Sequence, residues 1–183
     1  MHEGTYLTMA VTGHVHETVS RLLGREARGL QEVPVVDDEG DPVVIRVASL
    51  VDGKPFPTLF WLVDPGLCYR IDREEATGLI ARFQNRIDDD TSLQASMAED
   101  HQAYIALRDS YIDEQERGQL EALGFSEVLA NRGIGGIADF TRIRCLHTWY
   151  GAHLVRPNTV GRLLDEHWAG GIKALLDQPN SIY

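Results

Sequence analysis

Strand-type sequence is confined to one short part of this chain, and this confinement limits the folds that are open to it. Two runs rich in β-branched residues, 29–36 and 43–51, are separated by the strong turn sequence DDEGDP at 37–42. A second turn at 52–57 leads into 58–63, whose TLFWLV sequence is apolar on both faces and is typical of a covered strand. We therefore predict three consecutive antiparallel strands.

Helical periodicity dominates outside these strands. A short first helix is predicted over 12–24, and the pattern turns helical again after the N-cap and N1 pair Asp64-Pro65. Ser92 opens a long helix whose acidic face we interpret as solvated. Two more helices are predicted, one centred on Tyr150 and one capped by Asn158.

These elements predict one α+β domain over residues 12–178. In it, a small three-stranded antiparallel meander packs against a predominantly helical C-terminal part. Residues 1–11 are expected to form a flexible N-terminus, and Gly170-Gly171 is expected to interrupt the last helix.

Composition excludes several classes of protein. The net charge of −11 opposes binding to nucleic acid or to an anionic membrane, because those polyanions select broad basic surfaces. No apolar run approaches the roughly 20 residues of a membrane span, and His2 and Glu3 stand where a signal peptide would be basic. We expect a cytoplasmic protein whose two cysteines are reduced.

One segment, Gly133 to Arg162, is basic within this acidic chain. It holds four arginines and one aspartate, a net charge of +3, whereas the remaining residues carry −14. Clustered guanidinium groups are costly to keep together unless an anionic or carboxylate-bearing group faces them. The functional site is therefore expected here.

Cys145, His147 and His153 in this segment are all metal-ligand types. In a straight helix, however, Cys145 and His147 would project about 160° apart and could not share an ion. A metal site requires that Cys145 to His147 be extended or in a turn, with the helix starting afterwards. The alternative is that Cys145 and the histidines are packed structural residues.

Two further kinds of chemistry suit this segment. His147 or His153 could transfer protons near neutral pH, and Cys145 could be a nucleophile if its thiolate were stabilised nearby. The helix start at Asn158, flanked by Arg156 and by Arg162, could bind phosphate or carboxylate. The alternative for these two arginines is salt bridging to the acidic long helix.

Four blocks of sequence resemble the bacterial family known as domain of unknown function 501, which has no assigned activity. They are LGREARG at 23–29, DGKPFPTLFWL at 52–62, RIRCLHTWYGAHL at 142–154 and NTVG at 158–161. The resemblance implies that these distant blocks meet in one pocket. It also implies a cell-division partner, because members are often encoded beside a septum-formation protein.

The chain departs from this family's pattern at two positions. Arg144 stands where lysine is usual, which preserves the charge, and Asp64 stands where cysteine or histidine is common. Since all three of those residue types bind metals, the resemblance implies a metal site of Asp64, Cys145 and His147, with zinc as the metal to test.

Our leading hypothesis is a pocket for a phosphorylated or carboxylated small molecule, walled by Trp61, Trp149 or Tyr150. His147 or His153 would be the catalytic group if the protein is an enzyme. The expected ligand-binding residues are Arg25, Arg28, Lys54, Thr58, Arg142, Arg144, Arg156 and Asn158. The alternative is a non-enzymatic adaptor for an acidic segment of a cell-division partner.

Overall fold

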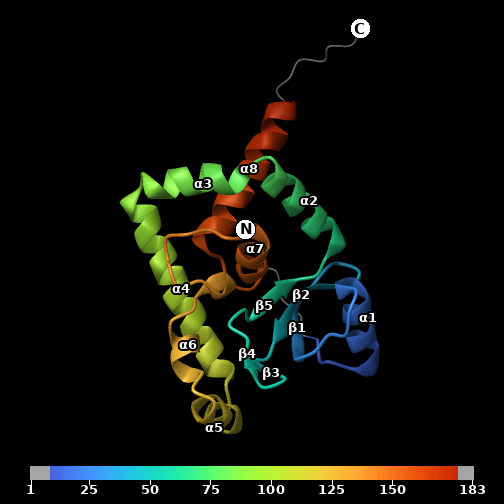
Figure 1. The fold of residues 1–183 in the computed structure, drawn as a ribbon. Coiled ribbons are helices and arrows are strands. Elements are labelled where there is room, and N and C mark those ends of the chain that lie inside the picture. The colour runs from blue at the N-terminus through green and yellow to red at the C-terminus, as the bar shows by residue number, and fades with distance from the viewer. Residues whose placement is uncertain (1–8, 177–183) are drawn as a thin grey trace.

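The predicted meander is present at the centre of the protein. The computed structural model describes residues 9–176, and β1 (Leu30–Val36), β2 (Pro42–Val47) and β5 (Phe60–Leu62) form an antiparallel sheet in the order β1-β2-β5 (Figure 1). The α+β class is confirmed. Most of the segment expected to be flexible lies outside the described residues, and Met9 within it pairs with Val33.

The second predicted strand is shorter than expected, because the chain leaves the sheet at Ala48. The N–H of Ala48 donates to the carbonyl of Gly29, and β3 (Leu50–Val51) then pairs with β4 (Lys54–Pro55) in a separate hairpin. The turn between them is Asp52-Gly53, with φ angles of 51° and 71°. Positive φ at both central positions is the geometry that Asp-Gly favours in tight hairpins.

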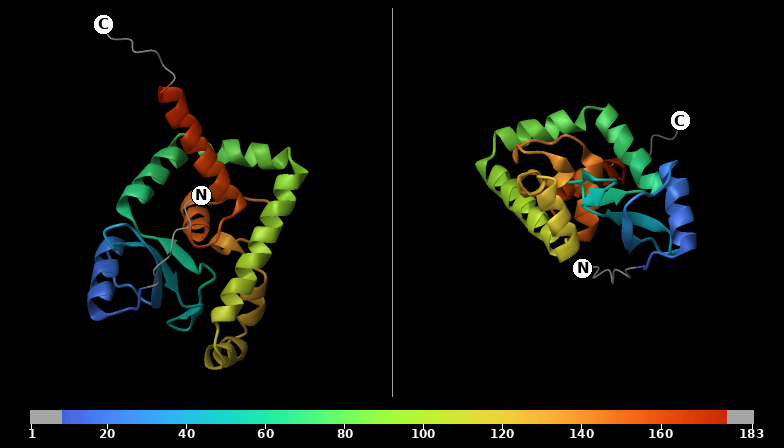
Figure 2. Two further views of the ribbon diagram at one scale, coloured as in Figure 1. Left: turned by 180° about the vertical axis from the view of Figure 1, so that it is seen from behind. Right: turned by 60° about the horizontal axis from the view of Figure 1, so that its bottom comes forward.

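A helix covers each face of the three-stranded sheet. α1 (Gly13–Leu23) packs on one face with Ile45 and Val47, whereas Val44 and Phe60 point to the other face, where α7 (Leu146–Val155) lies. Figure 2 shows the sheet and α7 between α1 and the long helix α4 (Thr91–Tyr111). The apolar alternation of the strands therefore supplies two separate cores.

The other helices surround α7. The predicted helical stretch after Asp64 breaks at Gly78, where φ is 78°, and the long helix begins one residue before Ser92. Gly170-Gly171 does not interrupt the last helix, so that expectation was wrong; glycine in a helix costs only about 1 kcal/mol relative to alanine.

The remaining helices are α2 (Pro65–Ala76), α3 (Leu79–Asp88), α4 (Thr91–Tyr111), α5 (Glu114–Ala122), α6 (Ser126–Ala130), the 3-10 turn η1 (Ile134–Gly136) and α8 (Thr159–Leu176). Within 9–176, no helix combines the length and apolar character needed to cross a membrane.

Two glycines allow α7 to pack closely against its neighbours. A Cβ atom on Gly151 would lie 3.1 Å from the backbone nitrogen of Leu62 in β5. A Cβ atom on Gly161 of α8 would lie 2.1 Å from Cγ of His153. The helix is buried on most sides, which is consistent with its almost uniformly apolar sequence.

α4 carries a stripe of three buried residues with polar groups, of which the sequence did not reveal His101 and Arg108. His101 Nδ1 accepts a hydrogen bond from the N–H of Ile134 (2.9 Å), and Tyr104 Oη accepts one from the N–H of Leu59 (2.6 Å). Arg108, which is 1% exposed, donates to backbone carbonyls of two loops and of α6. These acceptors are the carbonyls of Pro57, Leu129 and Arg132.

Replacing Gly161 by alanine should destabilise the protein by roughly 2 kcal/mol, because the new methyl group would overlap the ring of His153. The matched control is Gly170→Ala in the same helix, where nothing lies within 4 Å of the added Cβ. It should stabilise the protein by about 0.5–1 kcal/mol through helix propensity. Urea unfolding measures both changes. Equal effects at the two positions would contradict the packing assigned to Gly161.

Burial lowers the pKa of His101 from 6.5 to about 4. Between these values the unfolded chain binds a proton at His101 and the folded protein does not, so the free energy of unfolding should fall as pH is lowered. The expected loss is up to about 3 kcal/mol. Urea unfolding at several pH values should show a shallower slope for His101→Asn, which retains an acceptor near Nδ1. The exposed-site control His14→Asn should leave the slope unchanged.

Candidate functional site

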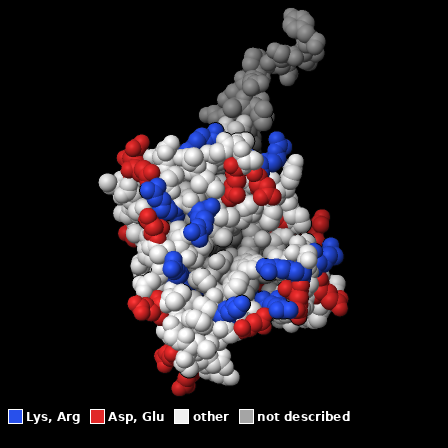
Figure 3. Space-filling model, in the orientation of Figure 1, with Lys and Arg blue, Asp and Glu red and all other residues white. Residues whose placement is uncertain are grey.

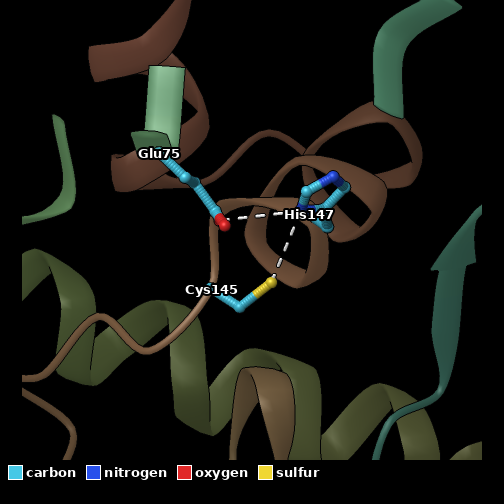
Figure 4. A group of neighbouring side chains, drawn as sticks. All are labelled: Glu75, Cys145 and His147. Atoms are coloured by element: carbon cyan, nitrogen blue, oxygen red, sulfur yellow. Dashed lines mark hydrogen bonds and ion pairs between the residues drawn. The ribbon is translucent and has the colours of Figure 1, made fainter. Parts of the chain in front are cut away.

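Three potential metal-ligating or catalytic side chains meet at the start of α7. Glu75 reaches in from the end of α2, Cys145 precedes α7, and His147 lies in its first turn (Figure 4). Cys145 is extended, with φ −156° and ψ 127°, and the helix starts at the next residue. This is the conformation that a shared site for Cys145 and His147 requires, and we name the three residues the Glu-Cys-His cluster.

Hydrogen bonds orient the members of the Glu-Cys-His cluster. His147 Nδ1 lies 3.6 Å from Cys145 Sγ and 3.5 Å from Glu75 Oε1. His147 Nε2 lies 3.2 Å from the carbonyl oxygen of Cys68, and because a carbonyl only accepts, Nε2 carries a hydrogen. Glu75 Oε1 accepts the N–H of Leu146 at 2.6 Å. The Nδ1 atom of His147 therefore faces the sulfur and the carboxylate.

The surroundings affect the two described cysteines and His147 differently. The hydrogen bond with Cys145 is the main cause that raises the pKa of His147 to about 9. Burial, assisted by the charges of Asp64 and Asp72, raises the pKa of the Cys68 thiol to about 11. Both cysteines are free, as predicted, but Cys68 is held as a thiol and directs its Sγ to the carbonyl of Leu62 at 3.7 Å.

Asp64 does not join this group. Its Oδ1 accepts the N–H of Leu67 at 2.6 Å and so caps the first turn of α2. The Asp64-Pro65 pair thus has the capping role that the sequence indicated. Glu75 occupies the place in the cluster that the family resemblance suggested for Asp64.

A concave surface extends from the cluster across the edge of the sheet. Thr58 and His147 line a pocket of about 350 Å³ between β5 and α7. Three cations, which come from the loop after α1 and from the β3–β4 hairpin, line a second pocket of about 390 Å³. Phe56 and Trp61 belong to both pockets and form their shared wall. Those cations are Arg25, Arg28 and Lys54. Figure 3 shows Lys and Arg side chains on both sides of a hollow on this face.

The three cations of the larger pocket are not equivalent. Arg28 is bound by Glu26 at 2.9 Å and by Asp52 at 3.0 Å, so it joins the loop after α1 to the β3–β4 hairpin. Arg25 lies over the ring of Trp61, 5.2 Å from its centroid. Among the residues that the structure describes, no carboxylate pairs with Arg25 or Lys54. These two cations are therefore available to a ligand.

The structure does not bring the C-terminal part of the predicted site into this concavity. His153 is buried, accepts the N–H of Asn158 at Nδ1 and contacts Asp165 through Nε2, each at 3.0 Å. Asn158 caps α8 by accepting the N–H of Gly161 at 2.8 Å. The predicted anion at this helix start is supplied by the chain itself, because Asp100 of α4 accepts the N–H of Thr159 at 2.7 Å.

The remaining predicted residues also lie outside the two pockets. Arg156 lines a cavity of about 20 Å³, which is barely large enough for one water molecule. Arg142 pairs with Asp88 and Asp139, whereas Arg144 is exposed beside the cluster. Of the expected aromatic residues, Trp61 lines both pockets, and Trp149 and Tyr150 are buried in the core.

Glu75 is the site residue that the sequence analysis missed. It is one of several acids in α2 and lies 72 residues before His147. The one signal that could have singled it out is its spacing from Ile71 and Asp72. Because it follows them by four and three residues, Glu75 lies on the same side of α2, where the helix meets α7. Without the fold, that position looks like ordinary helix surface.

The fold and the site define a class: an α+β protein in which a half-buried Glu-Cys-His cluster lies at one end of a concave surface. The chain belongs to the family described as protein of unknown function, DUF501, which matches residues 33–166. No curated protein and no solved structure matches the chain.

Alkylation should distinguish the two cysteines in metal-free protein. Cys68 should react slowly with iodoacetamide at mildly alkaline pH, because its raised pKa leaves little thiolate. Cys145 is half-buried beside the His147 imidazole and should react about tenfold faster or more. Peptide mass spectrometry measures both rates. Preferential labelling of Cys68 would contradict the environments assigned to these thiols.

Proposed function

We propose that this protein binds a small phosphorylated or carboxylated molecule in the pocket between the loop after α1 and the β3–β4 hairpin. The observation that carries the proposal is the pair of cations, Arg25 and Lys54, which line the pocket without a carboxylate partner among the described residues. Guanidinium and ammonium groups that face a partly enclosed space stabilise an anion more than they would in bulk water.

The rest of the pocket favours an apolar or aromatic ligand body. Its floor includes Ile45 and Val47 of the sheet, and its wall is the pair Phe56 and Trp61, whose ring centroids are 5.5 Å apart. Ligand sites commonly combine such a wall with a few charged groups. Thr58, beyond the wall in the neighbouring pocket, supplies a hydroxyl.

An enzymatic role would use the far end of the same surface. Of the two histidines considered for proton transfer, His147 lines the pocket beside β5, whereas His153 is buried and lines neither pocket. In an enzyme of this kind, His147 is therefore the residue that we assign to acid–base chemistry, provided that no metal ion occupies its Nδ1 atom.

Isothermal titration with inorganic phosphate, a nucleoside monophosphate, a sugar phosphate and a tricarboxylate tests the binding proposal. Arg25→Ala and Lys54→Ala should each weaken the best binder roughly tenfold, because each removes a charged contact. Arg142→Ala is the matched control, since Arg142 is exposed and pairs with Asp88 outside the pocket. No binding by any probe, or an equal loss in Arg142→Ala, would overturn the proposal.

The adaptor alternative makes a different prediction. An acidic partner segment would use Arg156, which lines a cavity too small for a side chain, and Arg162 in the first turn of α8. An acidic peptide added to the same titrations separates the two functions. Peptide binding that is lost on charge reversal at Arg162, without binding of the small anions, would favour the adaptor.

A further inference from the structure

The geometry points to a divalent transition-metal site, best suited to zinc, formed by Glu75 Oε1, Cys145 Sγ and His147 Nδ1. The site is separate from the anion pocket and uses none of its cations. It differs from the metal set that the family resemblance implied, because Glu75 replaces Asp64. The three donor atoms lie within 4.8 Å of one another.

Two of the three separations between the donor atoms match edges of a zinc tetrahedron. Zinc bonds of about 2.3 Å to sulfur and about 2.05 Å to nitrogen, at a tetrahedral angle, place the two ligand atoms about 3.6 Å apart. Cys145 Sγ and His147 Nδ1 are 3.6 Å apart. The nitrogen-to-oxygen edge should be about 3.4 Å, and His147 Nδ1 and Glu75 Oε1 are 3.5 Å apart. Since all three donor atoms lie within 4.8 Å of one another, a shift of the thiol or the carboxylate is enough to place an ion between them.

Hydrogen bonds outside the donor set hold two of the donors in place. The carbonyl of Cys68 binds the Nε2 hydrogen of His147, which leaves Nδ1 for the metal. This histidine-to-carbonyl contact is the usual arrangement behind metal-bound imidazoles. The N–H of Leu146 fixes the Glu75 carboxylate at 2.6 Å. Metal binding therefore does not need to order these side chains first.

The combination of donors selects the metal. A thiolate and an imidazole favour zinc or cobalt over magnesium and calcium, which prefer oxygen ligands alone. Sites in which three protein ligands leave the fourth position to water are typical of catalytic zinc, whereas structural zinc sites have four protein ligands. Among the described residues, Cys68 and Asp72 also approach His147, but they do so on its Nε2 side. The fourth position is left to a water molecule.

Cobalt binding tests the site directly. The full chain, purified without a histidine tag and freed of metal with a chelator, should bind one Co²⁺ ion with visible bands of tetrahedral cobalt. A near-ultraviolet thiolate-to-cobalt band should accompany them, and zinc should abolish both. Cys145→Ser should remove the thiolate band, whereas Cys68→Ser, the matched control, should retain it.

Glu75→Gln keeps the test valid if Cys145→Ser does not fold. Glutamine preserves the size of the side chain and an acceptor for the N–H of Leu146, so the fold should be retained as judged by circular dichroism. It should weaken metal binding about tenfold or more because a charged ligand is lost. Arg25→Ala should leave metal binding unchanged. Absence of cobalt binding in the folded wild type, or loss of the thiolate band in Cys68→Ser but not in Cys145→Ser, would overturn the proposal.

Discussion

The guanidinium group of Arg108 joins the parts of the fold that hold the concave surface in shape. It is buried and binds the carbonyl of Pro57 before β5, the carbonyl of Leu129 in α6 and the carbonyl of Arg132 in the loop that leads to η1. A buried cation is costly unless its donors are satisfied, so these contacts fix both loops against α4. One turn before Arg108 in α4, Tyr104 accepts the N–H of Leu59 before β5. Two turns before it, His101 accepts the N–H of Ile134 at the start of η1. One face of α4 therefore sets where β5 and η1 lie around α7.

Much of the fold follows from local sequence, whereas this face of α4 does not. The turn at 37–42 and the β-branched runs beside it predict the sheet, and Asp64 and Asn158 cap their helices as expected. His101 and Arg108 look like ordinary polar positions, because their partners lie 33 and 51 residues away. Long-range backbone acceptors leave no periodic signal in a sequence.

The candidate site was predicted in part for the same reason. The sequence allows one site for Cys145 and His147 because both are metal-ligand types that an extended Cys145 would bring together, and the structure has that conformation. It places Arg25 and Lys54 in one pocket because both lie in blocks shared with the family, and both line the larger pocket. Glu75 could not be found, because its role depends on how α2 crosses α7. Asn158 was assigned to a ligand although it serves α8, since a helix start that attracts an external anion attracts an internal carboxylate equally well.

The close approach of α7 to β5 at Gly151 gives the surface a fixed width. His147 lies one helical turn before Gly151, and Trp61 is the residue before Leu62, which Gly151 contacts. The spacing between the imidazole of His147 and the indole of Trp61 thus depends on the absence of a side chain at Gly151. Any larger residue at position 151 would push α7 away from β5 and so change the shape of the pocket that His147 and Trp61 line.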